Sequence, residues 1–501
     1  MSLMGIDIGT TGCKAVAFDE SGKLISYAYR EYPLHAPNPG WAELDSKQVW
    51  NDTKDCIREV ANKTKRDPIQ ALAVSCQGEA VTAIGANDEF LSNSIVSFDP
   101  RTGPYVEQWI ERFGRDTLFQ ATGQPPASIF TALKLNWYRD NQPEVLDNAK
   151  YILGYEDLIN YFLTGEAVVD YSLAGRTMLF DIVKEEWRDD FLGALGLTSE
   201  VMPKAVPSGT LVGTVKDSIA DEIGLPRGVK VVTGGHDQPC QMLGAGVTDA
   251  KTAAYGIGTV ACIGAAFDKA LLNEQMLASN LCCYHHTCPD LYCVLVYNYT
   301  GAVLFRWYRD QFAREESQRA KKQKRDVYEI LTEEASDKPT DLLVLPHFTT
   351  TGVPHFDNKS KGAIIGLTLD TTKAEITRAL LEGVTYELRQ GMELLAQAGG
   401  KVEAYRATGG GAKSPYWLQI KADIMGVPVA APEVAEAGCL GAAVLAGAAS
   451  GVYASIPEAA KTVARIEHTY KPNPENKKLY DERFDWYKEI YPKNKDLFGR
   501  M

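Results

Sequence analysis

The hydrophobic pattern switches repeatedly between two periods along the chain. Short apolar runs at 71–76, 229–233 and 405–408 have the length and β-branched content of buried strands. Apolar residues at helical spacing over 46–62 and 373–398 predict amphipathic helices. Because strands and helices alternate in sequence, we predict an α/β fold.

The same pattern predicts further elements and a polar tail. Helices are expected at 103–119, 132–139, 300–312, 415–425 and 438–450, and strands at 80–84 and 341–346. The last segment, 469–501, is polar and contains three prolines. We expect it to wrap the surface of the protein.

A glycine-containing hairpin motif occurs twice. Residues 4–30 form two β-rich runs around a turn, and a similar pattern returns at 253–267. Superposed, the two runs pair Gly9 with Gly258, Thr10 with Thr259 and Cys13 with Cys262. Because the second copy begins about halfway along the chain, we predict two related domains, 4–250 and 251–501. A chain of 501 residues also exceeds the size of about 250–300 residues at which single cores stop growing.

The composition narrows the class of protein. Hydrophobic residues make up 45% and charged residues 23%, which excludes a disordered, collagenous or coiled-coil chain. The net charge of −13 disfavours binding to nucleic acid or to an anionic membrane surface, and apolar runs long enough to span a membrane are lacking from the sequence. Ten cysteines are too sparse for a disulfide scaffold, so we expect a cytoplasmic location.

Two glycine–threonine loops are candidates for phosphate binding. The strings GTTG at 9–12 and GIGT at 256–259 each follow a short apolar strand. Glycine allows close approach of the backbone to a ligand, and consecutive N–H groups form an anion-binding nest. An acid just before such a loop, Asp7, suits a hydrated Mg²⁺ ion. The alternative is a pair of tight hairpins that bind nothing.

A third glycine cluster, TGGGAKS, occupies 408–414 between a predicted strand and a predicted helix. It matches neither the P-loop pattern nor the dinucleotide-binding fingerprint. It is either a flexible turn or a flat backbone surface against which an adenine or ribose can lie.

Five motifs now occur in a familiar order: IDIGTT at 6–11, GGHD at 234–237, GIGT at 256–259, KGAIIGL at 361–367 and TGGGAKS at 408–414. Together they resemble the FGGY family of carbohydrate kinases over nearly the whole chain. The resemblance implies two actin-like, ribonuclease H-like domains with ATP and a sugar in the cleft between them. It also accounts for the repeated hairpin, since actin-like ATPases carry one phosphate loop per domain.

The resemblance also implies roles for individual residues. Asp237 takes the place of the general base that accepts the proton of the sugar hydroxyl, and Asp7 that of the acid on the Mg²⁺ side. Phosphoryl transfer needs mainly alignment, charge neutralisation and one positioned acceptor. The expected phosphate contacts are Thr10, Thr11, Lys14, Gly258, Thr259 and Gly301, and the expected adenosine contacts are Gly410, Gly411 and Ser414. The alternatives are a helix-capping or turn aspartate at 237 and a solvated hairpin lysine at 14.

On the sugar side, Gln77, Glu79 and Asp99 are the candidates for reading hydroxyl groups. Glu79 could instead be a solvated acid at a strand end. His236, next to the expected base, is placed with the substrate-binding residues and is expected to orient or pack rather than catalyse.

The sugar-side residues also depart from the best-known members of the family. The Trp and Tyr that bind substrate in glycerol kinases fall on Ser97 and Ile129, which disfavours glycerol. Residues 97–102 are more similar to fuculose- and rhamnulose-type kinases. The expected substrate is therefore a ketose phosphorylated on a primary hydroxyl, either a pentulose such as xylulose or a 6-deoxyhexulose, or a related polyol. A homodimer is the expected assembly.

Three other interpretations remain open at this stage. Four cysteines and two histidines within 282–293 could bind zinc, but their spacing fits a hairpin around Pro289 and Asp290 better. The basic run at 314–326 is either a solvated helix or loop or a nucleic-acid patch. A different class of function, an actin-like ATPase used for assembly or chaperoning, would share the glycine loops but would not need Asp237.

Overall fold

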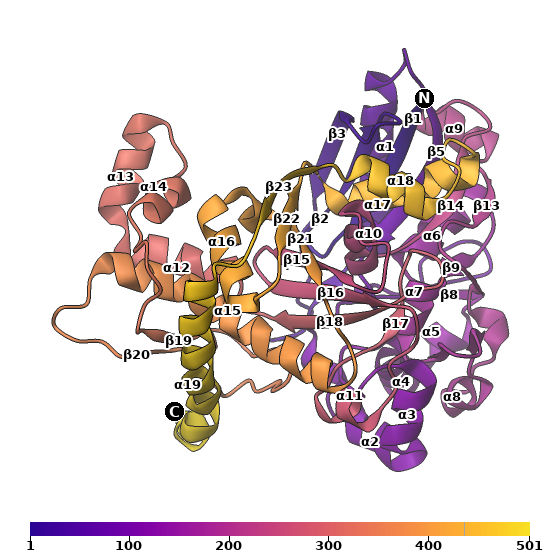
Figure 1. The fold of residues 1–501 in the computed structure, drawn as a ribbon. Coiled ribbons are helices and arrows are strands. Elements are labelled where there is room, and N and C mark those ends of the chain that lie inside the picture. The colour runs from indigo at the N-terminus through magenta and orange to yellow at the C-terminus, as the bar shows by residue number, and fades with distance from the viewer. Residues whose placement is uncertain (435) are drawn as a thin grey trace.

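The computed structural model describes residues 1–434 and 436–501. Its first half is built on a six-stranded mixed sheet, and its second half on a seven-stranded one (Figure 1). In spatial order the first sheet contains β13 (Leu211–Thr214), β14 (Lys230–His236), β5 (Ile69–Cys76), β1 (Ser2–Ile8), β2 (Gly12–Phe18) and β3 (Leu24–Glu31). The second contains β17 (Tyr284–His285), β18 (Tyr292–Asn298), β16 (Ala261–Phe267), β15 (Thr252–Ile257), β21 (Ala404–Thr408), β22 (Val429–Pro432) and β23 (Ile466–Tyr470).

The two sheets share one strand arrangement. In the first, β1 runs antiparallel to β2 and parallel to β5, which is parallel to β14. In the second, β15 runs antiparallel to β16 and parallel to β21, which is parallel to β22. An antiparallel outer strand follows in each sheet, β13 beside β14 and β23 beside β22. The predicted α/β duplication is therefore confirmed.

The hairpin loops of the two halves differ by one residue. Ile8 pairs with Cys13, so residues 9–12 form the first loop. Ile257 pairs with Ala261, so residues 258–260 form the second. Cys13 therefore corresponds in position to Ala261, and the sequence-based pairing of Cys13 with Cys262 is wrong by one residue.

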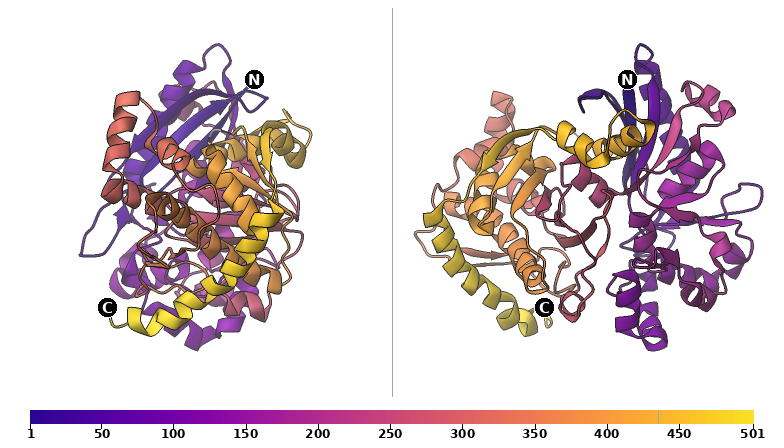
Figure 2. Two further views of the ribbon diagram at one scale, coloured as in Figure 1. Left: turned by 60° about the vertical axis from the view of Figure 1, so that its left-hand side comes forward. Right: turned by 45° about the vertical axis from the view of Figure 1, so that its right-hand side comes forward.

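The helices that cover the first sheet come from both ends of the chain. Helices α1 (Ser46–Lys63) and α6 (Tyr155–Thr164) pack on its strands, as do α10 (Asp237–Gly244) and the much later α17 (Ala437–Ser450). Figure 2 shows α17 and the neighbouring α18 (Ile456–Val463) lying against the first half. A Cβ at Gly5 would lie 1.8 Å from the Cys439 carbonyl oxygen, so glycine is required where β1 meets α17. A cut at residue 250 therefore does not separate the packing of the two halves.

Most predicted helices are present within a few residues of their expected bounds. They include α4 (Thr131–Asn141), α12 (Ala302–Phe312), α15 (Lys373–Gln397) and α16 (Pro415–Met425). The helix predicted at 103–119 is instead two, α2 (Tyr105–Phe113) and α3 (Arg115–Thr122). Gly114 separates them with a φ of 82°, a conformation that a helix cannot contain.

Shorter elements complete the fold. The strands are β4 (Glu43–Leu44), β6 (Thr82–Ile84), β7 (Ser94–Ile95), β8 (Tyr151–Leu153), β9 (Val168–Asp170), β10 (Phe180–Asp181), β11 (Glu186–Trp187), β12 (Lys204–Val206), β19 (Leu343–Leu345) and β20 (Ala363–Ile365). The helices are α5 (Pro143–Asp147), α7 (Tyr171–Ala174), α8 (Asp189–Ala194), α9 (Asp217–Ile223), α11 (Glu274–Ala278), α13 (Arg314–Gln323) and α14 (Val327–Glu333).

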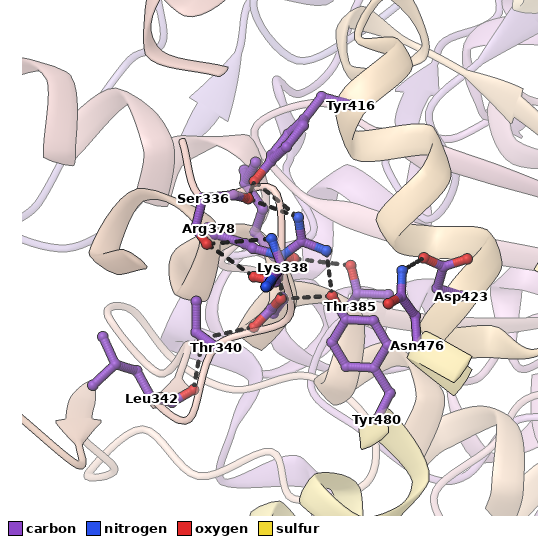
Figure 3. A network of polar contacts seen from close by, with 12 residues as sticks. Ser336, Lys338, Thr340, Leu342, Arg378, Thr385, Tyr416, Asp423, Asn476 and Tyr480 are labelled. Carbon is purple, nitrogen blue, oxygen red and sulfur yellow. Dashed lines mark hydrogen bonds and ion pairs between the residues drawn. The ribbon is translucent and has the colours of Figure 1, made fainter. Parts of the chain in front are cut away.

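The polar tail is a docked helix, so the expectation of a surface wrap is wrong. Helix α19 (Pro474–Phe498) buries one face, and its Tyr480 hydroxyl donates to Glu382 of α15 at 2.6 Å. Arg378 donates to the same hydroxyl at 2.7 Å, in the network drawn in Figure 3. Asn476 donates to Asp423 of α16 at 2.8 Å. Aromatic residues at helical spacing form the buried stripe that the many lysines and glutamates concealed.

The structure shows the conformation of the two segments that were left open. Strands β17 and β18 form an antiparallel hairpin, with Tyr284 opposite Cys293, as expected for 282–293. Among residues 1–434 and 436–501, no three or more His, Cys, Asp and Glu side chains are grouped to hold a metal ion. The basic run lies largely in α13. Within the same residues, helices that combine the length and apolarity of a membrane span are absent.

Candidate active site

Asp237 occupies the first position of α10, at the end of a parallel strand of the first sheet. Strand β14 continues through both glycines to His236, so the expected glycine turn is instead an extended strand. A Cβ at Gly234 would lie 2.0 Å from the Val74 carbonyl oxygen, so only glycine allows this close approach to β5. The N–H of Gly234 donates to the buried Glu156 carboxylate at 2.5 Å. Helix α10 contacts strands of both sheets, which places Asp237 between the halves.

The Asp237 carboxylate is suited to accept a proton. Its side chain is 38% exposed, while its Oδ1 is buried and lacks a hydrogen-bond partner within the described chain. Burial, followed by the negative charges of Asp7 and Glu79, raises the pKa of Asp237 to about 7. A base with a pKa near the working pH is effective in proton transfer.

His236 lies beside this carboxylate in a fixed, uncharged state. Its Nε2 is 3.2 Å from Oδ1 of Asp237, and its Nδ1 shares a hydrogen bond of 2.8 Å with the Tyr284 hydroxyl. Burial, with a smaller effect from Arg176, lowers the pKa of His236 well below its ordinary value. The neutral ring therefore lies between the Asp237 carboxylate and the Tyr284 hydroxyl.

Asp7 and Lys14 face each other across the first hairpin. Oδ1 of Asp7 accepts from Ser75 at 3.1 Å, and Oδ2 lies 3.3 Å from the ammonium group of Lys14. Lys14 also donates to Glu436 at 2.7 Å. Lys14 is therefore paired, and the alternative of a merely solvated lysine is not what the structure shows. Burial raises the pKa of Asp7, although Lys14 opposes this effect.

A cavity of about 1010 Å³ joins these groups to the third glycine cluster. Asp7, Lys14 and Asp237 line it, together with Thr408, Gly409, Gly410, Ala412 and Lys413. Gly411 is buried within the same loop, and Ser414 caps α16 by accepting from the Trp417 N–H at 3.3 Å. The cavity has the volume of a site for a nucleotide-sized ligand.

The two hairpin loops are tied to different partners. Thr10 donates to Oε1 of Gln77 at 3.0 Å, which links the first loop to the end of β5, and Thr11 is exposed beside it. In the second half, the Gly301 N–H donates to the Thr259 carbonyl at 2.9 Å. The next N–H, at the start of α12, donates to the Gly258 carbonyl at 2.8 Å. Gly258, Thr259 and Gly301 thus form one backbone unit.

Glu79 is a buried ion-pair partner rather than a solvated acid. Its Oε1 accepts from Nε of Arg176 at 2.6 Å and also from Nη2. Its backbone has a φ of 65°, and its carbonyl accepts from Thr131 at 2.9 Å and from Lys134 at 3.0 Å. A non-glycine residue in this conformation is strained and persists only where its surroundings hold it.

Comparison with known proteins identifies the family. The model of the FGGY family of carbohydrate kinases, N-terminal domain, matches residues 2–244, and the model of the C-terminal domain matches residues 253–450. The chain belongs to the FGGY family of carbohydrate kinases. It is therefore a sugar kinase, an enzyme that transfers phosphate, and kinases of the FGGY family use ATP as the phosphate donor. Its two-domain, actin-like α/β architecture agrees with that family.

Named FGGY relatives act on more than one substrate. A xylulose kinase of Staphylococcus epidermidis is 30% identical over 499 residues, or 99% of this chain and 97% of that protein. A gluconokinase of Bacillus subtilis is 31% identical over 463 residues, or 90% and 87% of the two chains. The crystal structure of gluconate kinase from Lactobacillus acidophilus superposes with a TM-score of 0.90 at 26% identity, covering 100% of this chain and 99% of that one.

One sequence-based assignment in this FGGY kinase needs correction. Asp99 was expected to read sugar hydroxyls, but its side chain is fully buried and both of its oxygens are used by the protein. Oδ1 accepts from the Arg101 N–H and Nε at 2.9 Å, and Oδ2 accepts from Nη2 of Arg101 at 2.8 Å and from the Ala42 N–H at 2.6 Å. Asp99 therefore anchors its own loop.

Two charged partners of the predicted site residues were not found from the sequence. Arg176, the partner of Glu79, stands alone in the apolar string LAGRTMLF at 173–180, and that isolation was an available signal. Glu436, the partner of Lys14, lies 422 positions further along the chain, and its sequence neighbourhood gives no signal of this pairing.

Proposed function

We propose that this FGGY kinase transfers the γ-phosphate of ATP to a primary hydroxyl of a ketose or related polyol. The ketose would be a pentulose such as xylulose or a 6-deoxyhexulose. The observation that supports this most strongly is the Asp237 carboxylate, partly exposed at the start of α10, with a pKa raised to about 7. It lies beside His236 and within the electrostatic reach of Glu79, where a hydroxyl-bearing substrate can bind.

The chemistry then needs one proton acceptor and several donors. The Asp237 carboxylate takes the proton of the substrate hydroxyl as that oxygen bonds to the γ-phosphorus. The bond between the γ-phosphorus and the β–γ bridging oxygen breaks, and ADP leaves with the electron pair. Backbone N–H groups of the two hairpin loops, with Thr10, Thr11, Lys14, Gly258, Thr259 and Gly301, are proposed to contact the phosphates. Gly410, Gly411 and Ser414 are proposed to contact the adenosine.

The donor chemistry around Asp7 fits a magnesium ion. Mg²⁺ keeps several waters in protein sites and takes one or two carboxylates together with substrate phosphates. Asp7 offers one carboxylate with 22% of its side chain exposed, on the wall of the cavity that Asp237 also lines. A magnesium ion held there by Asp7 would supply charge neutralisation to the phosphates of ATP. Lys14, held by Asp7 and Glu436, keeps a positive charge at the same wall.

An ADP-coupled assay tests this function. The substrates are ketopentoses, ketohexoses, 6-deoxyketoses, alditols and aldonates, and we expect ADP release to depend on a ketose or polyol. ATP hydrolysis that is indifferent to every sugar would support an actin-like ATPase of another class instead. Sedimentation tests the homodimer, and cell fractionation tests the cytoplasmic location, which both stay predictions.

A further inference from the structure

Glu79, Arg176 and His236 converge around Gly78 at the proposed sugar end of the site. A Cβ at Gly78 would lie 3.1 Å from Cδ2 of His236 and 3.3 Å from Cβ of Arg176. His236 is in turn 3.2 Å from the Asp237 carboxylate. The ion pair of Glu79 and Arg176 therefore borders the place where the acceptor hydroxyl must bind.

All three nitrogens of the Arg176 guanidinium donate a hydrogen bond to the protein. Its Nε and Nη2 both donate to Oε1 of Glu79, and its Nη1 donates to Gln124 at 3.1 Å. The second carboxylate oxygen of Glu79 makes no hydrogen bond to the described residues, and neither does the amide nitrogen of Gln77. The pair therefore leaves one carboxylate oxygen as an acceptor for a ligand, while its positive charge is already matched.

The other cations that approach this end are also committed. The ammonium of Lys134 is fully buried and donates to the Glu79 carbonyl at 3.0 Å. Lys14 is paired with both Asp7 and Glu436. A ligand carboxylate would thus be repelled by the carboxylates of Glu79, Asp237 and Asp7. The nearby cations would not offset this repulsion, because each is already paired within the protein. Like charges placed together in a binding site are strongly unfavourable.

The backbone shows that this arrangement is held in place. Glu79 keeps a φ of 65°, and hydrogen bonds from Thr131 and Lys134 to its carbonyl stabilise that conformation. Such strain persists where the surroundings fix the residue, and it is concentrated at binding and catalytic sites.

We infer that the Glu79–Arg176 pair selects uncharged polyhydroxy substrates and rejects aldonates. The Glu79 carboxylate neutralises the positive charge of Arg176, which therefore cannot attract the carboxylate of an aldonate. This inference rests on the proposed function and narrows its substrate class. By this inference, the substrate of this chain differs in charge from the one in the name of the 31% identical gluconokinase of Bacillus subtilis.

The test compares matched ligands on the wild-type enzyme. Each alditol is paired with the aldonate of the same carbon skeleton, so the two differ only by a CH₂OH or a carboxylate group at C1, and ketoses are measured beside them. We expect kcat/KM to favour the uncharged member by ~100-fold or more, because the aldonate carboxylate is repelled by the carboxylates of the site. Equal or greater activity on aldonates would overturn the inference and leave the kinase function standing. If the enzyme phosphorylates neither series, the proposed function is refuted, and so is the inferred selectivity for uncharged substrates.

A pair of variants then tests the residues themselves. Glu79→Gln keeps an amide oxygen for Arg176 but removes the balancing charge, so we expect the preference for uncharged substrates to narrow by ~10-fold or more. Glu79→Gln combined with Arg176→Gln removes both charges. In this double variant we expect the relative kcat/KM for aldonates to lose the increase seen in Glu79→Gln. A preference that is unchanged in Glu79→Gln would contradict the assignment.

Thermal melting shows whether each variant is folded. If Glu79→Gln does not fold, calorimetric titration of the wild-type protein with the matched alditol and aldonate decides instead. Weaker binding of the aldonate supports the inferred selectivity for uncharged substrates, and equal binding overturns it.

Discussion

The two halves of this kinase share a strand order but differ in where their charges lie. In the first half, Asp7 and Lys14 face each other across the hairpin, and Asp237 follows the second parallel partner strand. In the second half, Gly256 and Cys262 stand opposite each other in the equivalent hairpin. The first half thus carries the acid, the base and the cation of the proposed site, and the second carries a short loop of backbone N–H groups.

This difference teaches that duplicated topology fixes where a loop lies but not what it does. Both loops follow equivalent strands, because β1 and β15 each pair antiparallel with the next strand and parallel with a later one. The two loops differ in length and in the residues that they contact. The first loop is hydrogen-bonded through Thr10 to Gln77, at the proposed sugar end, and the second is hydrogen-bonded through Gly301 at the start of α12.

The strongest test of this division removes the proposed base from the first half. Asp237→Asn keeps the shape and a hydrogen-bonding side chain but cannot accept the proton, so kcat should fall by ~10²-fold or more. Asp268→Asn, at an exposed acid after β16 in the second half, is the matched control and should leave kcat unchanged. Thermal stability and ATP binding should change little in both variants. Retention of most activity by Asp237→Asn would move the base elsewhere, and unfolding would make Asp237 a structural residue.

The pH profile tests the same carboxylate without a mutation. Below its pKa of about 7, Asp237 is protonated and cannot act as a base, so kcat/KM for the sugar should rise with pH and level off above 7. The acidic limb should approach about tenfold per pH unit. Because the charge of Glu79 helps to raise this pKa, Glu79→Gln should move the limb to lower pH. A limb near the ordinary aspartate value would contradict the assignment.

Loss of the Glu79 carboxylate should affect the sugar and spare the nucleotide. Glu79→Ala removes a charge-assisted hydrogen bond, so the KM for the sugar should rise by ~10-fold or more while the KM for ATP stays nearly constant. Steady-state kinetics with each substrate varied in turn give both values. An unchanged sugar KM would remove Glu79 from the binding site.

Threonine truncation compares the two loops directly. Thr10→Ala loses the hydrogen bond to Gln77 and should raise the KM for both the sugar and ATP, each by about fivefold, the equivalent of one neutral hydrogen bond. Thr259→Ala should raise the KM for ATP alone, by a similar factor. If both variants change the same constants, the loops are not specialised as described.

The smallest expected effect is a change of shape. Since each half supplies one loop to the site, sugar and nucleotide together should close the cleft by a hinge near residue 250 and expel water. Small-angle scattering should show a smaller radius of gyration for the doubly liganded protein than for the free protein. Identical profiles would argue against closure.

The sequence predicted those features that depend on local patterns. The repeat of Gly9 at Gly258 and the strand before His236 follow from periodicity and glycine position, and the structure confirms both. The partners of Lys14 and Glu79 could not be predicted, because Glu436 and Arg176 are brought close only by the folded chain. Asp99 differs, because most of its hydrogen bonds come from Arg101, two residues further on, and only the one from the Ala42 N–H spans 57 positions.

Long-range packing also explains why the tail was mistaken. The charged composition of 474–498 hides a stripe of aromatic residues, and that stripe becomes a buried face only when α15 and α16 are present to receive it. The polar residues of a helix indicate which face is exposed to water. Whether the opposite face is buried depends on the surface against which the helix packs.

The return of α17 to the first sheet has a consequence for synthesis. Leu3, Ala71, Ala73 and Val232 lie in one buried cluster with Leu440 and Val444 of that helix. After residue 244 has been made, the ribosome must add roughly 200 more residues before residue 450 exists, which takes about 10–40 s at about 5–20 residues per second. For that interval α10 lies on this face of the nascent sheet without the longer helix α17 beside it. The first half, although complete in sequence, stays unfinished until nearly the whole protein has been translated.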